Sequence, residues 1–166
     1  MATGNTLVTL YPADNEPPAS AYATLDTRNA HPTLDFDDSA ATEAAVFSFI
    51  LPRHYAAGGI TVYLHWAATS ATSGNVMWQT SFERIGAASQ DMDSDGFATA
   101  VTWSAAAADG TSGKVVISSQ AHTDGAQIDS IAVGELCRLK VERLGSNGSD
   151  TMVGDAELVA IELKET

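Results

Sequence analysis

The sequence predicts an all-β protein, a two-sheet antiparallel sandwich of the jelly-roll type with an extended N-terminal arm. Three observations predict this class. Apolar and polar residues alternate over short runs, turns rich in Gly, Ser, Asp and Pro separate the runs, and no segment has a 3.6-residue apolar period with helix caps. About seven runs follow residue 43 and one or two precede it, enough for two sheets that protect their edges by packing face to face.

The N-terminal residues 1–33 are expected to form an arm or a pair of short edge strands. A β-rich run over residues 6–11 stops at Pro12, whose ring removes a backbone donor from the strand. Residues 20–36 alternate only loosely. The sandwich domain itself is expected to span residues 34–166.

From residue 43 onward, strands are expected wherever apolar residues recur at every second position. The predicted strands are residues 44–51, 60–66, 75–85, 97–103, 114–119, 136–144 and 152–163. Residues 121–134 suggest a loop or one short turn of helix. An immunoglobulin-like sandwich is the structural alternative, but its Cys…Trp…Cys spacing is absent because the chain has a single cysteine, Cys137.

The charge balance excludes two classes of partner. The chain has 8 Lys and Arg against 21 Asp and Glu, a formal net charge of −13. Nucleic acids and anionic membranes both bind through Lys and Arg, so neither is an expected partner. The chain begins without a signal peptide and lacks a run of about 18 apolar residues, so synthesis in a host cytoplasm is expected.

No catalytic motif is visible, and the chain is predicted not to be an enzyme. The sequence has no G-x-S-x-G nucleophile turn and no phosphate-binding glycine loop that opens a helix. Its four histidines are not at metal-ligand spacing. The acidic residues 35–43 could be described as a carboxylate pair for glycoside cleavage, but a solvated loop before a strand explains them better.

One short motif suggests a metal. Asp91, Asp93, Asp95 and Gly96 match the first six positions of a calcium loop, but position 12 is Thr102 in place of the bidentate Glu. An Asp-rich hairpin loop has the same residues because Asp bonds to its own backbone in turns. No cofactor is therefore expected, with these three aspartates as a weak calcium candidate.

The three tryptophans could pack in the core or form a platform for sugar rings. Trp66 and Trp78 share strand faces with aliphatic and aromatic residues, which favours the core. Trp103 lies on the same face of its predicted strand as Phe97 and Val101, which also favours the core. Because it is the last residue of that strand, it is the tryptophan most suited to an exposed contact.

Five stretches resemble tailed-phage and marine-virus virion structural proteins. They are LDFDD (34–38), AVFSFILP (45–52), GITVYLHW (59–66), ATSATSGNVMW (68–78) and DTMVGDAEL (150–158). This resemblance implies a jelly-roll-like sandwich, commonly homotrimeric, on the capsid exterior or in tail fibres. Residues 1–33 lie outside it.

The resulting functional expectation is a phage capsid decoration (cement) protein at the capsid surface, bound to the major capsid protein and to copies of itself. Such a protein would stabilise the head by binding only the assembled shell. The residues expected to make these contacts are Leu7, Leu10, Tyr11, Tyr22, Leu25 and Trp103. The alternative is a tail-fibre or receptor-binding jelly-roll domain that recognises a host glycan through loops 67–75, 86–96 and 104–113.

Overall fold

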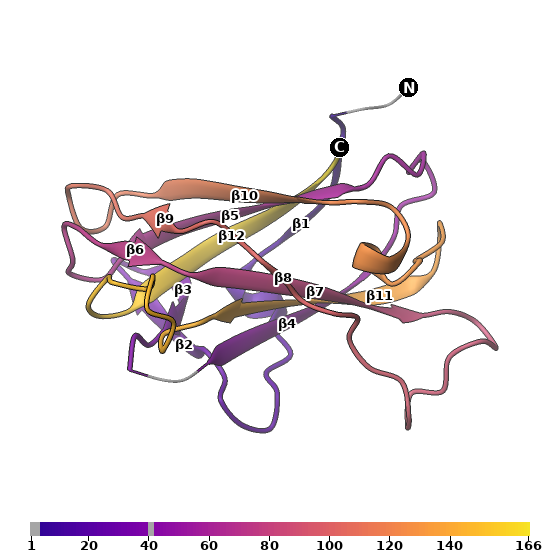
Figure 1. Ribbon diagram of the computed structural model, residues 1–166, viewed down its shortest axis with the longest axis horizontal. Coiled ribbons are helices and arrows are strands. Elements are labelled where there is room, and N and C mark those ends of the chain that lie inside the picture. Colours follow the sequence, from indigo (N-terminus) through magenta and orange to yellow (C-terminus); the bar gives the residue numbers. More distant parts are fainter. Residues whose placement is uncertain (1–3, 40–41) are drawn as a thin grey trace.

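The computed structural model describes residues 4–39 and 42–166, which form an antiparallel β-sandwich of two main sheets (Figure 1). The predicted fold class is therefore confirmed. The predicted turn of helix within residues 121–134 is also present, as the 3₁₀ turn η2 (Ala126–Ile128). No helix in these residues is long and apolar enough to cross a membrane.

Sheet A contains both ends of the chain. Its strands run in the order β10-β5-β12-β3-β2, and β1 pairs with the C-terminal part of β12 beyond the end of β3. The strands are β1 (Thr6–Leu10), β2 (Thr24–Arg28), β3 (His31–Phe36), β5 (Ile60–Ala68), β10 (Val116–His122) and β12 (Ala156–Glu165).

Sheet B is made only from the middle of the chain and runs in the order β4-β11-β7-β8. Its strands are β4 (Glu43–Ile50), β7 (Trp78–Ile85), β8 (Val101–Thr102) and β11 (Leu136–Arg143). A separate two-stranded ribbon pairs β6 (Asn75–Val76) with β9 (Ala106–Ala107). This ribbon divides the single strand predicted over residues 75–85 into β6 and β7.

The described part of the N-terminal segment lies against the sandwich as strands. β1 pairs with β12, and Leu7 and Leu10 are buried in the core. η1 (Pro12–Asp14) follows β1. β2 and β3 form a hairpin whose turn residues Asn29 and Ala30 both have positive φ, 48° and 64°, as a two-residue hairpin turn of the primed type requires. Residues 4–36 thus contribute three strands to sheet A.

The predicted strand over residues 97–103 is much shorter than expected. Only Val101 and Thr102 pair with β7, although the amide of Ala98 still donates to the carbonyl of Phe82. Phe97 leaves the strand and places its ring over two cationic side chains of β11. The alternation in this stretch therefore reflects one core contact by Trp103 and one contact outside the sheet by Phe97.

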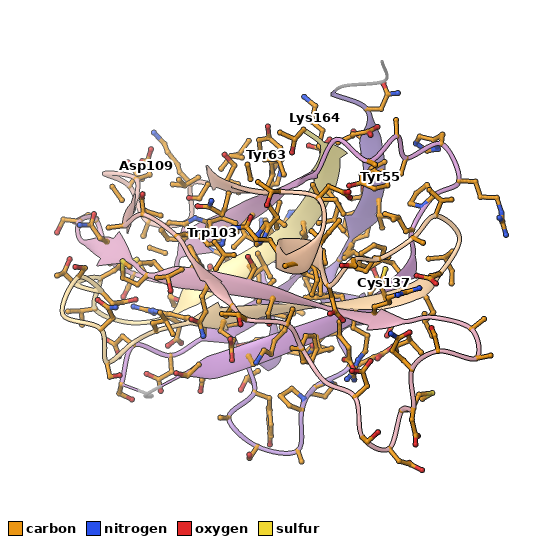
Figure 2. The ribbon with its side chains drawn as sticks, turned by 45° about the vertical axis from the view of Figure 1, so that its right-hand side comes forward. Tyr55, Tyr63, Trp103, Asp109, Cys137 and Lys164 are labelled. Atoms are coloured by element: carbon orange, nitrogen blue, oxygen red, sulfur yellow. The ribbon has the colours of Figure 1, made fainter. Side chains whose placement is uncertain are left out.

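Aromatic side chains fill the space between the two sheets. Trp66 and Trp78 are fully buried, as predicted, with ring centroids 6.0 Å apart, and Phe36 packs edge-on against Trp78. Trp103 is also buried, at 4% exposure, and does not make the exposed contact considered for it. Figure 2 shows Trp103 and Cys137 within the body of the sandwich, whereas Tyr63 and Lys164 lie on its upper side.

A buried arginine closes one end of the core. The Arg143 guanidinium donates to both carboxylate oxygens of Asp150 and to the carbonyls of Phe36, Met152 and Gly154. Both charged side chains are almost completely buried, at 0% and 1% exposure. Together these bonds fasten the turn after β11 to the end of β3.

Candidate functional site

The outer face of sheet B carries an ordered set of polar side chains, which we call the polar ladder. Alternate residues of β7 and β11 fill the core, as Phe82 and Leu139 do, so the intervening residues point outward. The register places the outward residues in three directly opposed pairs: Glu83 with Arg138, Ser81 with Lys140, and Gln79 with Glu142.

Most of the ladder is linked by charge-assisted contacts. Arg138 donates through Nε to Glu83 at 2.7 Å and also contacts Glu83 through Nη2. Gln79 donates to Glu142 at 2.7 Å, and Lys140 approaches the other oxygen of Glu142 at 3.1 Å. Two cations and two anions therefore balance, so the ladder offers many hydrogen-bonding groups without a net charge.

The ladder is more sheltered than an ordinary outer face. Glu83 is 3% exposed and Ser81 is 1% exposed, whereas the side chains of Arg138 and Lys140 keep 34% and 26% of their surface. Within the described residues, the Ser81 hydroxyl has no hydrogen-bond partner. The groups of the ladder that a ligand can reach are therefore those of Arg138 and Lys140, which keep part of their surface exposed.

One short side chain of β4 leaves space beside the ladder. β4 is the other neighbour of β11, and its outward residues Ser48, Val46 and Ala44 lie opposite Arg138, Lys140 and Glu142. Val46 and Ala44 are buried, whereas Ser48 lines a hollow together with Arg138. We call the depression that contains this hollow and the ladder the sheet B groove.

The first wall of the groove is the segment of residues 15–23. It runs along the free edge of β4, where the amide of Glu16 donates to the carbonyl of Val46 at 2.7 Å. The Glu16 carboxylate in turn accepts a bond from the Ser48 hydroxyl at 2.8 Å. Figure 1 shows this segment projecting from the sandwich on the β4 side.

The second wall is the segment of residues 86–100, which projects on the same side (Figure 1). Its Phe97 ring covers the cations of β11, with the centroid 5.0 Å from Arg138 Cζ and 5.1 Å from Lys140 Nζ. Cation–π contacts of this kind fix both the ring and the cations. The ring therefore offers a rigid apolar edge beside the polar ladder.

The deepest part of the groove is a hollow of about 200 Å³ in which all of these elements meet. Its lining residues are Glu16, Ser48, Glu83, Ile85, Met92, Leu136 and Arg138. The chemistry of the site is thus a floor of paired donors and acceptors with apolar groups at its margins. The predicted loop 86–96 contributes to this site through Met92.

The structure separates the residues predicted to make contacts. Leu7, Leu10 and Trp103 are core residues, whereas Tyr11, Tyr22 and Leu25 are 55%, 49% and 60% exposed. None of these six lines the hollow of the sheet B groove, although Tyr22 lies in the segment that forms its first wall. The groove residues themselves were not predicted, although the alternation of Arg138, Lys140 and Glu142 with apolar residues is visible in the sequence.

The calcium candidate is an exposed turn. The Asp91 carboxylate accepts a bond from the amide of Asp93, and its carbonyl accepts bonds from the amides of Ser94 and Asp95. Within residues 4–39 and 42–166, no three His, Cys, Asp or Glu side chains are gathered in a way that could hold a metal. Calcium binding at this loop stays a prediction.

Comparisons with known proteins identify the fold and no family. No known protein family and no curated protein matches the sequence. Among solved structures, the chain is similar to a xylan-binding module, CBM15, with a TM-score of 0.53, 11% identity and 98% of each chain covered.

Weaker similarities are to the family 11 carbohydrate-binding module from Clostridium thermocellum (TM-score 0.49, 8% identity, 100% and 98% covered) and to the CBM22-1 xylan-binding domain of Xyn10C from Paenibacillus barcinonensis (TM-score 0.37, 11% identity, 99% and 96% covered). At these identities the similarity concerns the fold.

These findings correct the predicted function. The xylan-binding module CBM15 is a carbohydrate-binding module, and nothing found in the comparisons indicates a virion protein. The prediction of a capsid decoration protein is therefore wrong, and the alternative of a glycan-recognising jelly-roll domain fits the findings better. The capsid location and the homotrimer that accompanied the prediction have no support. What is established is a jelly-roll sandwich of the architecture that carbohydrate-binding modules also use.

Proposed function

We propose that this chain is a non-catalytic glycan-binding module whose ligand lies in the sheet B groove. The observation that carries the proposal is the polar ladder, a sheltered row of paired donors and acceptors on the outer face of a sheet. A sugar chain presents hydroxyls that both donate and accept, together with apolar C–H faces. A floor of planar polar side chains beside the Phe97 ring matches both features.

The charges of the groove favour a neutral glycan. Within the ladder the two cations and two anions balance, so a charged ligand would gain no net attraction from it. The whole chain carries a formal charge of −13, which repels polyanionic glycans at a distance. Neutral polysaccharides such as xylan or β-glucan are therefore the ligands to test first, and the xylan-binding module CBM15 shares the fold.

The same pairing supports binding without catalysis. Glycoside cleavage needs one protonated carboxylic acid and one free carboxylate on either side of the scissile bond. In the groove, Glu83 is held by Arg138, and Glu142 is held by Lys140 and Gln79. Both carboxylates of the ladder are thus held by neighbouring donor side chains, an arrangement that fixes hydrogen-bonding groups for a ligand.

Titration calorimetry with xylohexaose, a mixed-linked β-glucan tetrasaccharide and oligogalacturonate tests the proposal. We expect binding to at least one neutral oligosaccharide and none to the anionic one. Gln79→Ala removes a ladder donor, and loss of one hydrogen bond of about 1 kcal/mol should weaken binding about fivefold. Phe97→Ala should weaken it by a similar factor.

The matched control is Gln120→Ala on β10, which changes an amide on the other sheet, sheet A, that bonds to the carbonyl of Ala121. Its affinity should equal that of the unmodified chain. Failure to bind any neutral glycan in the set would contradict the proposal, and so would equal affinities for the Gln79→Ala and Gln120→Ala variants.

A further inference from the structure

The opposite side of the sandwich carries a larger hollow, of about 620 Å³, on the outer face of sheet A. We call it the sheet A hollow. Its volume falls within the range of small-molecule sites in proteins. Its lining residues are Tyr11, Pro12, Ala13, Arg28, His31, Pro32, Thr33, Ala67, Gly113, Val115, Glu157 and Val159. They come from strands that are far apart in the sequence, so folding is what creates this surface.

Arg28 is the fixed polar group of the hollow. From the end of β2 its side chain reaches across the sheet, and Nη1 donates to Glu157 at 2.7 Å and to the carbonyls of Ala68 and Thr69. Gly113 lies flat against the guanidinium, because a Cβ at that position would be 2.7–3.0 Å from Nη2, Cζ and Nε. The guanidinium is therefore held in one orientation before any ligand arrives.

The held guanidinium keeps its other donors free. All three of its hydrogen bonds within the described residues use Nη1, so Nε and Nη2 have no partner there. The Arg28 side chain retains 35% of its exposure. Nε and Nη2 form the side of the guanidinium that donates two parallel hydrogen bonds.

Glu157 supplies an acceptor beside these donors. Its side chain is 7% exposed, and its Oε2 is engaged by Arg28. Its Oε1 has no hydrogen bond in the part of the chain that the structure describes, and it is not among the fully enclosed atoms. Because Glu157 lines the hollow, a ligand there can reach this oxygen. Two free donors and one free acceptor thus lie at one place on the floor of the hollow.

Apolar groups form most of the rest of the hollow, which also contains His31 and Thr33. The Tyr11 side chain, 55% exposed, belongs to one wall, and Val115, 52% exposed, belongs to another. Pro12, Pro32 and Val159 add rigid or branched apolar surface. A ligand in this space is therefore enclosed by apolar groups and held by hydrogen bonds at one end.

The chemistry of the hollow selects the class of ligand. An anion would approach the Glu157 carboxylate, and a cation would approach the Arg28 guanidinium, so both are disfavoured relative to a neutral molecule. A neutral ring with adjacent hydroxyls can accept from Nε and Nη2 through one hydroxyl and donate to Glu157 through the next. Its C–H faces can then lie against Tyr11 and the prolines.

We propose that the sheet A hollow is a second binding site, separate from the groove, that takes a single ring of a neutral sugar. The two sites lie on opposite faces of the sandwich, so each can be occupied without the other. This proposal does not depend on the groove being a glycan site. If both sites bind, one chain can hold a polysaccharide on one face and a chain end or a second glycan on the other.

Nuclear magnetic resonance titration of the ¹⁵N-labelled full chain tests the second site. The probes are methyl β-glycosides of xylose, glucose, galactose and mannose, with sodium glucuronate as the anionic comparison. We expect saturable shifts of the Gly113, Val115 and Val159 amides with at least one neutral glycoside, and at least tenfold weaker effects with glucuronate.

Three variants assign the shifts to the hollow. Arg28→Lys keeps a cation for Glu157 but removes the two free donors, and it should weaken binding at least fivefold. Val159→Phe fills the space and should abolish binding. Tyr22→Ala is the control, because Tyr22 is exposed to a similar degree as Tyr11 but does not line the sheet A hollow.

The two proposals can fail independently. Absence of shifts at the hollow with all four neutral glycosides would overturn the second site, whatever the groove does. Shifts that persist unchanged in both Arg28→Lys and Val159→Phe would also overturn it. Shifts at the hollow together with no glycan response at residues 79–83 and 138–142 would support the hollow and count against the groove.

Discussion

Lowering the pH from 7.5 to 5 should destabilise the fold through one buried histidine. The Trp103 indole donates to the Thr80 hydroxyl at 2.9 Å, and the same hydroxyl lies 2.9 Å from His122 Nε2. An indole N–H can only donate, so Thr80 accepts from Trp103 and keeps its own hydrogen for another acceptor. We infer that this hydrogen is donated to Nε2, which places the proton of the neutral His122 ring on Nδ1.

Burial makes protonation of this ring costly. His122 is 1% exposed and packs edge-on against Phe82, and desolvation lowers its pKa from 6.5 to about 4. A folded-state pKa below the unfolded value means that the unfolded chain takes up the proton first as the pH falls. The stability contributed by the neutral ring is complete above pH 6.5, and it is lost progressively between pH 6.5 and pH 4. The expected loss at pH 5 is about 2 kcal/mol, from about 1.4 kcal/mol per pKa unit.

Urea unfolding followed by tryptophan fluorescence measures this loss. The His122→Gln variant is the control, since its amide oxygen can accept from Thr80 but does not titrate. Carboxylates titrate in both chains, so their contribution cancels in the difference between the two free energies of unfolding. We expect the unmodified chain to lose about 2 kcal/mol more than the variant between pH 7.5 and pH 5. A difference within about 0.5 kcal/mol of zero would show that His122 titrates normally and would refute the inferred cost of protonating the buried ring.

Three further results are expected. Arg143→Met should lower the free energy of unfolding by about 3 kcal/mol or more, because it leaves the buried Asp150 carboxylate without its ion-pair partner. Arg53→Met, at an exposed position, should change the free energy of unfolding by less than about 0.5 kcal/mol. Similar values for the two variants would contradict the importance of the buried ion pair. Gly59→Ala should lower the free energy of unfolding by about 2 kcal/mol or more, because φ is +92° and the new Cβ would lie 2.6 Å from the His122 carbonyl oxygen. Gly110→Ala is the comparison, and it should not destabilise the fold because a Cβ at Gly110 would lie in open space. Burial raises the pKa of the Cys137 thiol to about 12, so a disulfide reagent at pH 8 should react only after urea unfolding, and rapid reaction in the folded state would place the thiol at the surface.

The fold could be predicted because its main strands carry a clear local signal. The two faces of β5 alternate from Ile60 to Trp66 and those of β11 from Cys137 to Glu142, and such alternation indicates one buried face. Residues 97–103 show where the signal misleads. The alternation of Phe97, Val101 and Trp103 suggests one continuous strand, yet Phe97 lies outside the sheet on Arg138 and Lys140.

The site could not be predicted because it depends on pairing between strands. Gln79 and Glu142 are 63 positions apart in the sequence, and only the register of β7 against β11 places them side by side. The same holds for Arg28 and Glu157, 129 positions apart, in the sheet A hollow. The sequence shows that each of these residues is polar, but it does not show which of them share a face. The prediction of capsid binding followed from a resemblance between short stretches of sequence, which gives no information on which polar residues lie side by side in the fold.

The most direct test of glycan recognition by the outer face of sheet B is a map of where a bound xylohexaose perturbs the amide resonances. If the polar ladder is the binding surface, the largest saturable shifts will occur at residues 79–83 and 138–142 and at Phe97 in the facing wall. Saturable binding that leaves these residues unchanged, or no binding of xylohexaose or of any neutral glycan tested with it, would contradict this assignment.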